Sequence, residues 1–235
     1  MNKVIVLCGG RGKRLGELSA KLPKPLIPLK GRPILQHILE SYISCGFKEF
    51  ILCTGYLSES IEAFIADNNF KAEIEISNAG EDASMLKRLF LAKNSIDKTA
   101  IVTYGDTFVN IDANSVIKEH KISKKDATVT IADIRSPFGI VRYDRDNRAT
   151  FFKEKPTFAY YIGHFIIEKK ILKNIDNNLL ALPDGEGLIM LFKNLIKEKK
   201  LNVYKHTGFN ITFNTTQELE KAEEDFIKFF TQQEG

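Results

Sequence analysis

Four cations and three glycines lie within a short segment near the start of the chain. The segment begins with the apolar run from Val4 to Leu7 and continues through Gly9, Gly10 and Gly12. Glycines let the backbone bend sharply and bring its N–H groups close to an anion. Residues of these types at this spacing predict a site for a phosphorylated ligand. The cations are Arg11, Lys13, Arg14 and Lys24.

The spacing excludes two well-known phosphate-binding motifs. A dinucleotide fingerprint needs a third glycine at the position where this chain has Leu15. A Walker A loop needs Ser or Thr after its Gly-Lys pair, and Lys13 is followed by Arg14 instead. The predicted phosphate site is therefore of another kind.

The elements that would position this segment alternate between apolar strands and amphipathic helices. Such alternation is typical of parallel βαβ units, so we predict an α/β fold with a doubly wound, mostly parallel mixed sheet flanked by helices. Ser58 is the predicted N-cap of one helix, and the strand at 73–77 alternates like an edge strand. In the first half, strands are predicted at 4–7, 50–54, 73–77 and 100–104, and helices at 33–45, 58–67 and 83–93.

Three residues lie within two positions of the ends of predicted strands. Doubly wound sheets bind ligands at the carboxyl ends of their strands, where Gly9, Gly55 and Asp106 are expected. A carboxylate beside a polyphosphate suits Mg²⁺, which takes one or two carboxylates together with phosphate oxygens. The alternative for Asp106 is a helix cap for the segment that begins near Asp112.

The second half of the chain is less regular. A polar turn is predicted at 144–147, and the strands on both sides of it would extend the same sheet. We find no repeat and no low-complexity linker, so residues 1–235 are predicted to form a single domain. In this half, strands are predicted at 127–132, 139–143, 149–152 and 160–167, and amphipathic helices at 186–199 and 216–230.

Composition narrows the class of protein. The 235 residues are 43% hydrophobic, enough for a full core, and the net charge of +4 suits anionic ligands without demanding nucleic acid. No signal peptide or membrane-length apolar run is present, so we expect a cytoplasmic protein with no membrane partner. Cys8, Cys45 and Cys53 lack metal-type spacing and are predicted to be buried, reduced thiols.

The runs from Gly9 to Leu15 (GGRGKRL) and from Pro23 to Leu26 (PKPL) resemble the double signature of the sugar-1-phosphate nucleotidyltransferases. These enzymes join a nucleoside triphosphate to a sugar 1-phosphate and have a Rossmann-like fold. The resemblance implies that Arg14 holds the triphosphate and stabilises departing pyrophosphate. It implies that Lys24 bridges the α-phosphate and the attacking phosphate, and that Asp106 binds Mg²⁺.

One branch of the family, the glucose-1-phosphate cytidylyltransferases, is most similar. Its motifs C-G-Y, T-G-E-D-S-M-T-G-G-R-L-K-R and Y-G-D-G match CTGY at 53–56, AGEDASMLKR at 79–88 and YGDT at 104–107. The resemblance implies CTP as the nucleotide, bound by residues 1–125. The residues expected to bind it are Leu7, Gly9, Gly10, Arg11, Gly12, Lys13, Gly55, Gly80, Glu81 and Tyr104.

The acceptor would bind within residues 126–215, ahead of a C-terminal helix at 216–235. Here the chain departs from the family: the Asn expected to contact a sugar hydroxyl is Ile162, and the second Asp expected at the metal is Asn214. An amide oxygen can ligate Mg²⁺ without bringing charge, so we expect weaker metal binding by Asp106 and Asn214. The residues expected to contact the acceptor are Gly139, Glu154, Lys155, Gly163 and His164, with a structural role as the alternative for His164.

These expectations combine into one predicted activity with two alternatives. The leading hypothesis is a Mg²⁺-dependent cytidylyltransferase that forms a CDP-sugar, or a related CDP-linked metabolite, in nucleotide-sugar and polysaccharide biosynthesis. One alternative is a guanylyltransferase that acts on heptose or mannose 1-phosphate. The other is a catalytically silent subunit that binds a sugar nucleotide. A homo-oligomer is possible for each of them.

Overall fold

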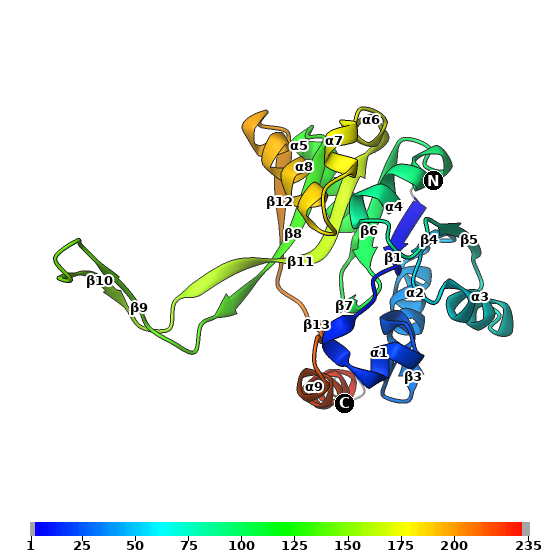
Figure 1. Ribbon diagram of the computed structural model, residues 1–235, viewed down its shortest axis with the longest axis horizontal. Coiled ribbons are helices and arrows are strands. Elements are labelled where there is room, and N and C mark those ends of the chain that lie inside the picture. Colours follow the sequence, from blue (N-terminus) through cyan, green and yellow to red (C-terminus); the bar gives the residue numbers. More distant parts are fainter. Residues whose placement is uncertain (1–2, 232–235) are drawn as a thin grey trace.

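The computed structural model describes residues 3–231 (Figure 1). Its strands are Lys3–Leu7 (β1), Pro28–Leu29 (β2), Arg32–Pro33 (β3), Glu49–Thr54 (β4), Glu73–Asn78 (β5), Thr99–Tyr104 (β6), Thr107–Val109 (β7), Ala127–Arg135 (β8), Ile140–Tyr143 (β9), Ala149–Lys153 (β10), Thr157–Glu168 (β11), Leu201–His206 (β12) and Asn210–Thr212 (β13). Its α-helices are Glu17–Lys21 (α1), Ile34–Ser44 (α2), Ser58–Asp67 (α3), Met85–Ala92 (α4), Ala113–Ser123 (α5), Lys169–Lys173 (α6), Asn177–Leu180 (α7), Glu186–Lys197 (α8) and Thr216–Thr231 (α9). Short 3₁₀ helices cover Lys13–Leu15 (η1), Lys24–Leu26 (η2) and Lys93–Ser95 (η3).

The main sheet has seven strands in the order β12-β8-β11-β6-β1-β4-β5. Strand β11 pairs antiparallel with both β6 and β8, and the other pairings in this sheet are parallel. The predicted doubly wound, mostly parallel mixed sheet is therefore confirmed, with β5 at one edge as expected. Strand β1 lies between β4 and β6, which places the topological switch point at its carboxyl end.

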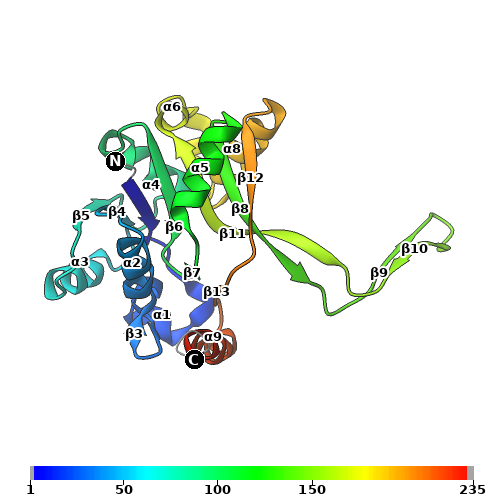
Figure 2. The same ribbon diagram turned by 180° about the vertical axis from the view of Figure 1, so that it is seen from behind.

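Helices cover both faces of this sheet (Figures 1 and 2). Successive residues of a strand point to opposite faces, so Val4 and Val6 pack with α2 and α5, whereas Ile5 and Leu7 pack with α4 and α8. The C-terminal helix α9 joins the first of these cores through Phe226, which is 1% exposed. Residues 232–235 of the predicted C-terminal segment lie outside the described part.

An arm, residues 136–156, projects from the body (Figures 1 and 2). Strands β9 and β10 form a two-stranded hairpin within it and do not pair with the main sheet. The prediction that 139–143 and 149–152 extend the sheet was therefore wrong. Alternating apolar residues on the arm pack against no second layer, and Phe138, Tyr143 and Phe152 are 76%, 70% and 67% exposed.

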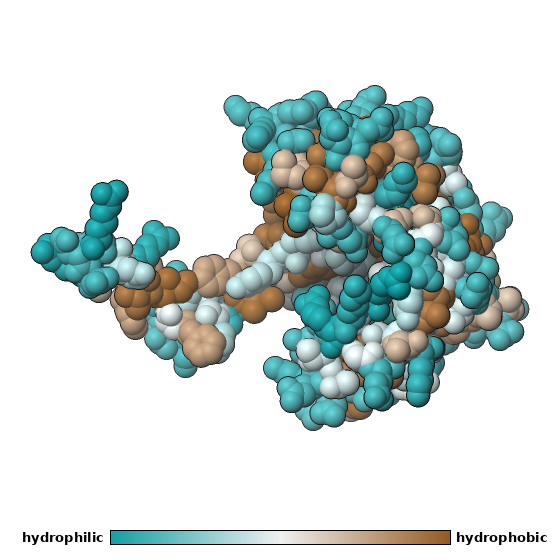
Figure 3. Space-filling model, in the orientation of Figure 1, coloured by the Kyte–Doolittle hydropathy of each residue, from teal (hydrophilic) through white to brown (hydrophobic). Residues whose placement is uncertain are grey.

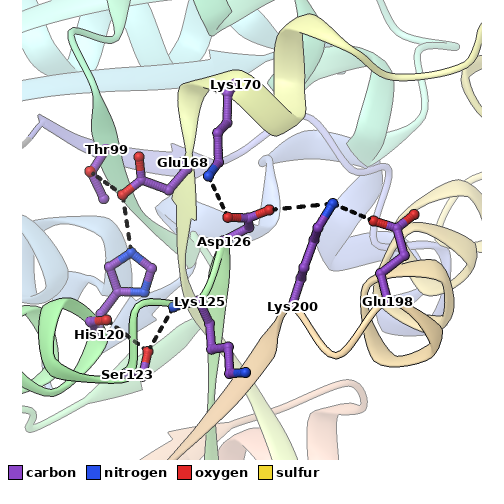
Figure 4. Close-up of polar contacts among 9 residues, drawn as sticks. All are labelled: Thr99, His120, Ser123, Lys125, Asp126, Glu168, Lys170, Glu198 and Lys200. Atoms are coloured by element: carbon purple, nitrogen blue, oxygen red, sulfur yellow. Dashed lines mark hydrogen bonds and ion pairs between the residues drawn. The ribbon is translucent and has the colours of Figure 1, made fainter.

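Polar contacts link the amino-terminal ends of strands β6, β8 and β12 (Figure 4). The Asp126 carboxylate lies 2.5 Å from Lys170 Nζ and 3.9 Å from Lys200 Nζ. On the neighbouring strands, Thr99 Oγ1 donates to Glu168 Oε1 at 2.9 Å, and His120 Nε2 lies 3.3 Å from the same oxygen. These contacts tie the beginnings of β6, β8 and β12 to the end of β11, at the opposite ends of the strands from Gly9 and Asp106.

Three local expectations need correction. Leu57, at φ 50°, occupies the cap position of α3, and Ser58 Oγ instead donates to Glu62 Oε1 and lies within hydrogen-bond distance of Thr54 Oγ1. Asp112 itself caps α5 by accepting from the amides at 114 and 115, so Asp106 is no helix cap. Strands β12 and β13 were missed: β12 directly follows a lysine-rich helix end, and β13 has only three residues. None of the helices within residues 3–231 is long and apolar enough to cross a membrane.

Candidate active site

The three strand ends singled out from the sequence meet at the switch point. Gly105 N donates to Leu7 O at 3.0 Å, and Tyr56 N donates to Gly9 O at 3.2 Å. The ends of β1, β4 and β6 are thereby held side by side, with the glycine-rich loop between them. Gly12 has φ 60°, which only glycine adopts readily, and this turn starts η1 with its two cations.

The cationic side chains of Lys13 and Arg14 are unpaired at this loop within the described part of the chain. Both side chains are exposed and form no ion pair or hydrogen bond with a residue of the described part. Arg11 is paired instead: its Nη2 lies 2.8 Å from Glu81 Oε2 and 3.1 Å from Asp82 Oδ1. Its guanidinium also lies over the Tyr56 ring, 5.2 Å from the ring centre. The two unpaired cations are the ones placed to take up an anion.

Lys24 forms the centre of a buried charged cluster. Its ammonium donates to Asp106 Oδ2 at 2.5 Å and to Asn214 Oδ1 at 3.3 Å, and its side chain is 8% exposed. Pro23 caps η2 in an extended conformation, which directs Lys24 inward. Thr107 Oγ1 donates to the other oxygen of Asp106 at 3.2 Å. The two predicted metal ligands therefore lie on either side of one ammonium.

A cavity of about 740 Å³ joins the loop to this cluster. Figure 3 shows the body hollowed between the part that carries α8 and the part that carries α1 and α9. The structure thus brings most of the predicted nucleotide, catalytic and metal residues to one cavity. The predicted residues that line it are Leu7, Gly9, Gly10, Arg11, Gly12, Lys13, Arg14, Lys24, Tyr104, Asp106, Gly163 and Asn214.

Three residues expected to bind the nucleotide do not line the cavity: Gly55, Gly80 and Glu81. Glu81 reaches the loop only through its ion pair with Arg11, at 2.8 Å. Gly80 lies at a turn with φ 83°, and its backbone N–H donates a hydrogen bond to Asn78 Oδ1 at 2.9 Å. These residues lie next to the glycine-rich loop but outside the cavity lining, so direct contact with a nucleotide is not supported for them.

Most of the predicted acceptor residues lie away from the cavity. Gly139, Glu154 and Lys155 belong to the arm, where the Glu154 carboxylate lies against Gly139. The prediction that they face an acceptor bound by the same chain is not supported, because the arm leads away from the body. Gly163 alone of this group reaches the cavity wall, beside Tyr104.

His164 is a structural residue and not an acceptor contact. It is completely buried, its Nδ1 lies 2.7 Å from Thr130 Oγ1, and its ring stacks on Tyr42 at 6.4 Å. Side chains alternate along β11, so His164 lies on the same face of the sheet as Ile162 and Ile166, the face that α2 covers. Burial, helped by nearby His206, lowers the pKa of His164 to about 3.

The lowered pKa of His164 predicts acid sensitivity. Between its unfolded value near 6.5 and about 3, the unfolded state binds the proton that the folded state refuses. The free energy of unfolding should therefore fall by up to about 1.4 kcal/mol for each pH unit below 6.5. Urea denaturation at pH 7.5 and 5.0 should show a loss roughly 2 kcal/mol larger in the wild type than in His164→Gln. Equal losses in the two proteins would contradict this assignment.

The second wall of the cavity is apolar, and apart from Ile162 its residues were not predicted from the sequence. It comes from β8, β11 and α8, and nothing local in those segments connects them with the glycine loop. Asp184 is the charged residue of this wall, and its Oδ1 accepts from the Met85 amide at 2.7 Å. An Asp-Gly pair before a predicted helix was the one available signal. The wall includes Ile134, Tyr160, Tyr161, Ile162, Leu188, Ile189 and Phe192.

Nucleophilic groups of the protein are poorly suited to attack. Burial raises the pKa of the Cys8 thiol well above its usual value and that of Cys53 to about 12. Burial likewise raises the pKa values of Tyr104 and Tyr161, so both phenols stay neutral at pH 7. Cys8 and Cys53 are buried and reduced as predicted, whereas Cys45 is only half-buried. These thiols and phenols are therefore not activated nucleophiles.

Comparison with known proteins agrees with this geometry. The family model described as nucleotidyl transferase matches residues 3–209. A probable glucose-1-phosphate cytidylyltransferase of Bacillus subtilis is 32% identical, over 92% of this chain and 93% of that protein. A D-glycero-alpha-D-manno-heptose 1-phosphate guanylyltransferase of Aneurinibacillus thermoaerophilus is 30% identical, over 65% and 67%.

The fold is shared with solved structures as well. HddC from Yersinia pseudotuberculosis superposes with a TM-score of 0.73 at 22% identity, covering 96% of this chain and all of that one. The match of the family model from β1 to beyond β12 includes the glycine loop, Lys24 and Asp106, the residues on which the cavity is built. The chain therefore belongs to the nucleotidyl transferase family, as one of its sugar-1-phosphate nucleotidyltransferases.

Proposed function

We propose that this chain condenses CTP with a sugar 1-phosphate, or a related phosphorylated metabolite, to give a CDP-linked product and pyrophosphate. The observation that carries the proposal is the buried Lys24 ammonium between Asp106 and Asn214, in the same cavity as Arg14. An ammonium fixed at this place can neutralise two phosphates as they approach. The choice of CTP is supported by the Gly-Glu-Asp and Leu-Lys-Arg segments and by the Bacillus subtilis relative.

The proposed reaction needs no general base. A phosphate monoester is largely ionised at neutral pH, since its second pKa is about 6. Its oxygen forms a bond to the α-phosphorus while the bond from that phosphorus to the bridging oxygen breaks, and the electron pair leaves with pyrophosphate. Lys24 neutralises the entering and α-phosphates, and Lys13 and Arg14 stabilise the leaving group. Such transfers depend mainly on positioning and charge.

Mg²⁺ is part of this proposal, with Asp106 and Asn214 as the residues that would hold it. Their oxygen donors are of the type that Mg²⁺ prefers, and it is usually bound through one or two carboxylates plus substrate phosphates. Within residues 3–231 no cluster of three or more His, Cys, Asp or Glu side chains could hold a metal without such phosphates. When bound, the ion would supply further neutralisation of phosphate charge.

Restoring a carboxylate at this site should strengthen metal binding. Asn214→Asp adds a negative charge beside Asp106, so we expect the Mg²⁺ concentration for half-maximal rate to fall roughly tenfold. Asn210→Asp is the matched control, because Asn210 lines the same cavity but does not contact Lys24. Magnesium titrations of the initial rate compare the three proteins. An unchanged midpoint in Asn214→Asp would remove Asn214 from the metal site.

The nucleotide and acceptor can be identified together. Incubation with each of CTP, GTP, UTP and dTTP and a panel of sugar phosphates, read by pyrophosphate release and product mass, should give a CDP-linked product. A GDP-linked product would favour the guanylyltransferase alternative, which the Aneurinibacillus relative supports. Nucleotide binding without turnover on any pair would favour the silent subunit. Because Ile162 and its neighbours form an apolar wall, we expect an acceptor with few hydroxyls on that side.

Self-association through the arm is also proposed, with a second copy of this chain as the partner. The arm exposes Phe138, Tyr143 and Phe152, yet its Glu154 and Lys155 do not reach the cavity of their own chain. A partner's cavity would give the Lys155 ammonium an anionic ligand to contact. Sedimentation of Phe138→Ser/Phe152→Ser should show a smaller particle than the wild type. Equal sedimentation would exclude the arm as the interface.

A further inference from the structure

Arg88 connects segments that are far apart in the sequence. It lies on α4, is 2% exposed and forms part of the cavity lining. Its Nε donates to Thr54 O at 3.3 Å, and its Nη2 donates to Gly9 O at 2.9 Å. Nη2 also lies 3.3 Å from Gly80 O and 3.2 Å from Glu81 O. One guanidinium thus holds the glycine loop, the end of β4 and the segment before α4.

This arrangement explains why two positions are glycine. A Cβ placed on Gly9 would lie 2.1 Å from Arg88 Nε, and one on Gly55 would lie 2.7 Å from Arg88 Nη2. Neither glycine has a left-handed φ, so backbone conformation is not the reason. Gly10, in contrast, has no atom within 4 Å of the same added carbon. Gly9 and Gly55 leave room for the guanidinium.

The charge of Arg88 is met by backbone carbonyls and not by a carboxylate. Among the described residues no acidic side chain lies within ion-pair distance of it, and Asp184 acts on it only from further away. Burial lowers the pKa of Arg88, yet a guanidinium stays protonated in proteins. A buried cation in a medium of low polarity acts over longer distances than one in water. Its charge therefore favours an anion bound on the loop above it.

We propose that Arg88 is a positioning residue for the nucleotide: it fixes Gly9, Thr54 and the Gly80–Glu81 segment as one unit and so sets the shape of the triphosphate and base subsite. Arg11 supports the same unit from the solvent side through Glu81 and Asp82. The proposal relies on the proposed function only in taking a nucleoside triphosphate as the ligand of the cavity. Its readouts do not require the acceptor to be known.

The first test separates positioning from stability. Arg88→Lys keeps a positive charge but loses the planar fork that serves several carbonyls at once. We expect CTP binding, measured by isothermal titration, to weaken roughly tenfold or more, since small misplacements of contact groups are costly. Leu89→Ala, a fully buried neighbour on α4, is the control that lowers stability without touching the loop. Equal CTP affinity in Arg88→Lys and Leu89→Ala would overturn the proposal.

The second test needs no ligand. Gly9→Ala should lower the denaturation midpoint in the wild type, because its methyl group meets the guanidinium, whereas Gly10→Ala should not. In an Arg88→Ala background the cost of Gly9→Ala should shrink, which a double-mutant cycle measures. Additive effects would overturn the proposal. If the cycle shows coupling but no nucleoside triphosphate binds, the proposed function fails and the structural role of Arg88 stands.

Discussion

Lys24→Met should lower the turnover number by roughly a hundredfold to a thousandfold, the usual effect of removing one fixed donor from a developing charge. The ammonium is held at 2.5 Å by Asp106 inside the cavity, so its position does not have to be found during each turnover. Without it, two phosphates carrying like charge must approach each other with less neutralising charge between them. Initial rates at saturating CTP and acceptor measure the loss.

Two comparisons make the Lys24 result interpretable. Lys21→Met removes the same charge from an exposed position three residues earlier and should leave the rate unchanged. Lys24→Arg keeps the charge but not the compact ammonium, and recovery of only part of the rate is expected. A Lys24→Met protein that folds and turns over at nearly the wild-type rate would refute the assigned role.

Asp106→Asn is expected to have the second largest effect, again about a hundredfold or more on turnover. The substitution removes the carboxylate on which Lys24 is positioned and the one charged group proposed to hold Mg²⁺. The variant should also lose about 1–3 kcal/mol of the free energy of unfolding, because the buried ammonium of Lys24 is left with weaker partners. Rate assays and urea denaturation measure the two losses separately.

Asp184→Asn is the matched control for this prediction. Asp184 lines the same cavity but contacts the Met85 amide and not Lys24. Its substitution should change turnover far less than Asp106→Asn does. If both variants lose the same activity, general negative charge in the cavity matters and the specific contact between Asp106 and Lys24 does not.

The nucleotide side of the cavity could be predicted because its determinants are local. Gly9 and Asp106 each lie within two positions of the end of a short apolar strand, and the carboxyl ends of neighbouring parallel strands must meet. Lys24 is fixed by prolines on both sides, which needs no knowledge of distant contacts. Strand order was not visible in the sequence, yet any doubly wound order with β1 inside the sheet gives the same convergence.

The acceptor side could not be predicted, because long-range geometry decides it. Alternating residues such as those at 149–152 fit a strand of the main sheet and a free hairpin equally well, and only the path of β8 and β11 selects the hairpin. The role of His164 likewise depends on long-range packing that the sequence does not show. Alternation along β11 gives its face, but only the packing of α2 against that face shows that His164 is buried beside Tyr42 and away from the cavity.

The late position of strand β13 in the sequence determines when the charged cluster can form during synthesis. The strand pairs with β7 and leads directly to Asn214, which meets Lys24 across 190 positions of sequence. During synthesis from the amino terminus, the loop, Lys24 and Asp106 emerge long before their last partner. The charged cluster is therefore completed only after Asn214 has left the ribosome, so a chain that stops before β13 cannot hold the finished site.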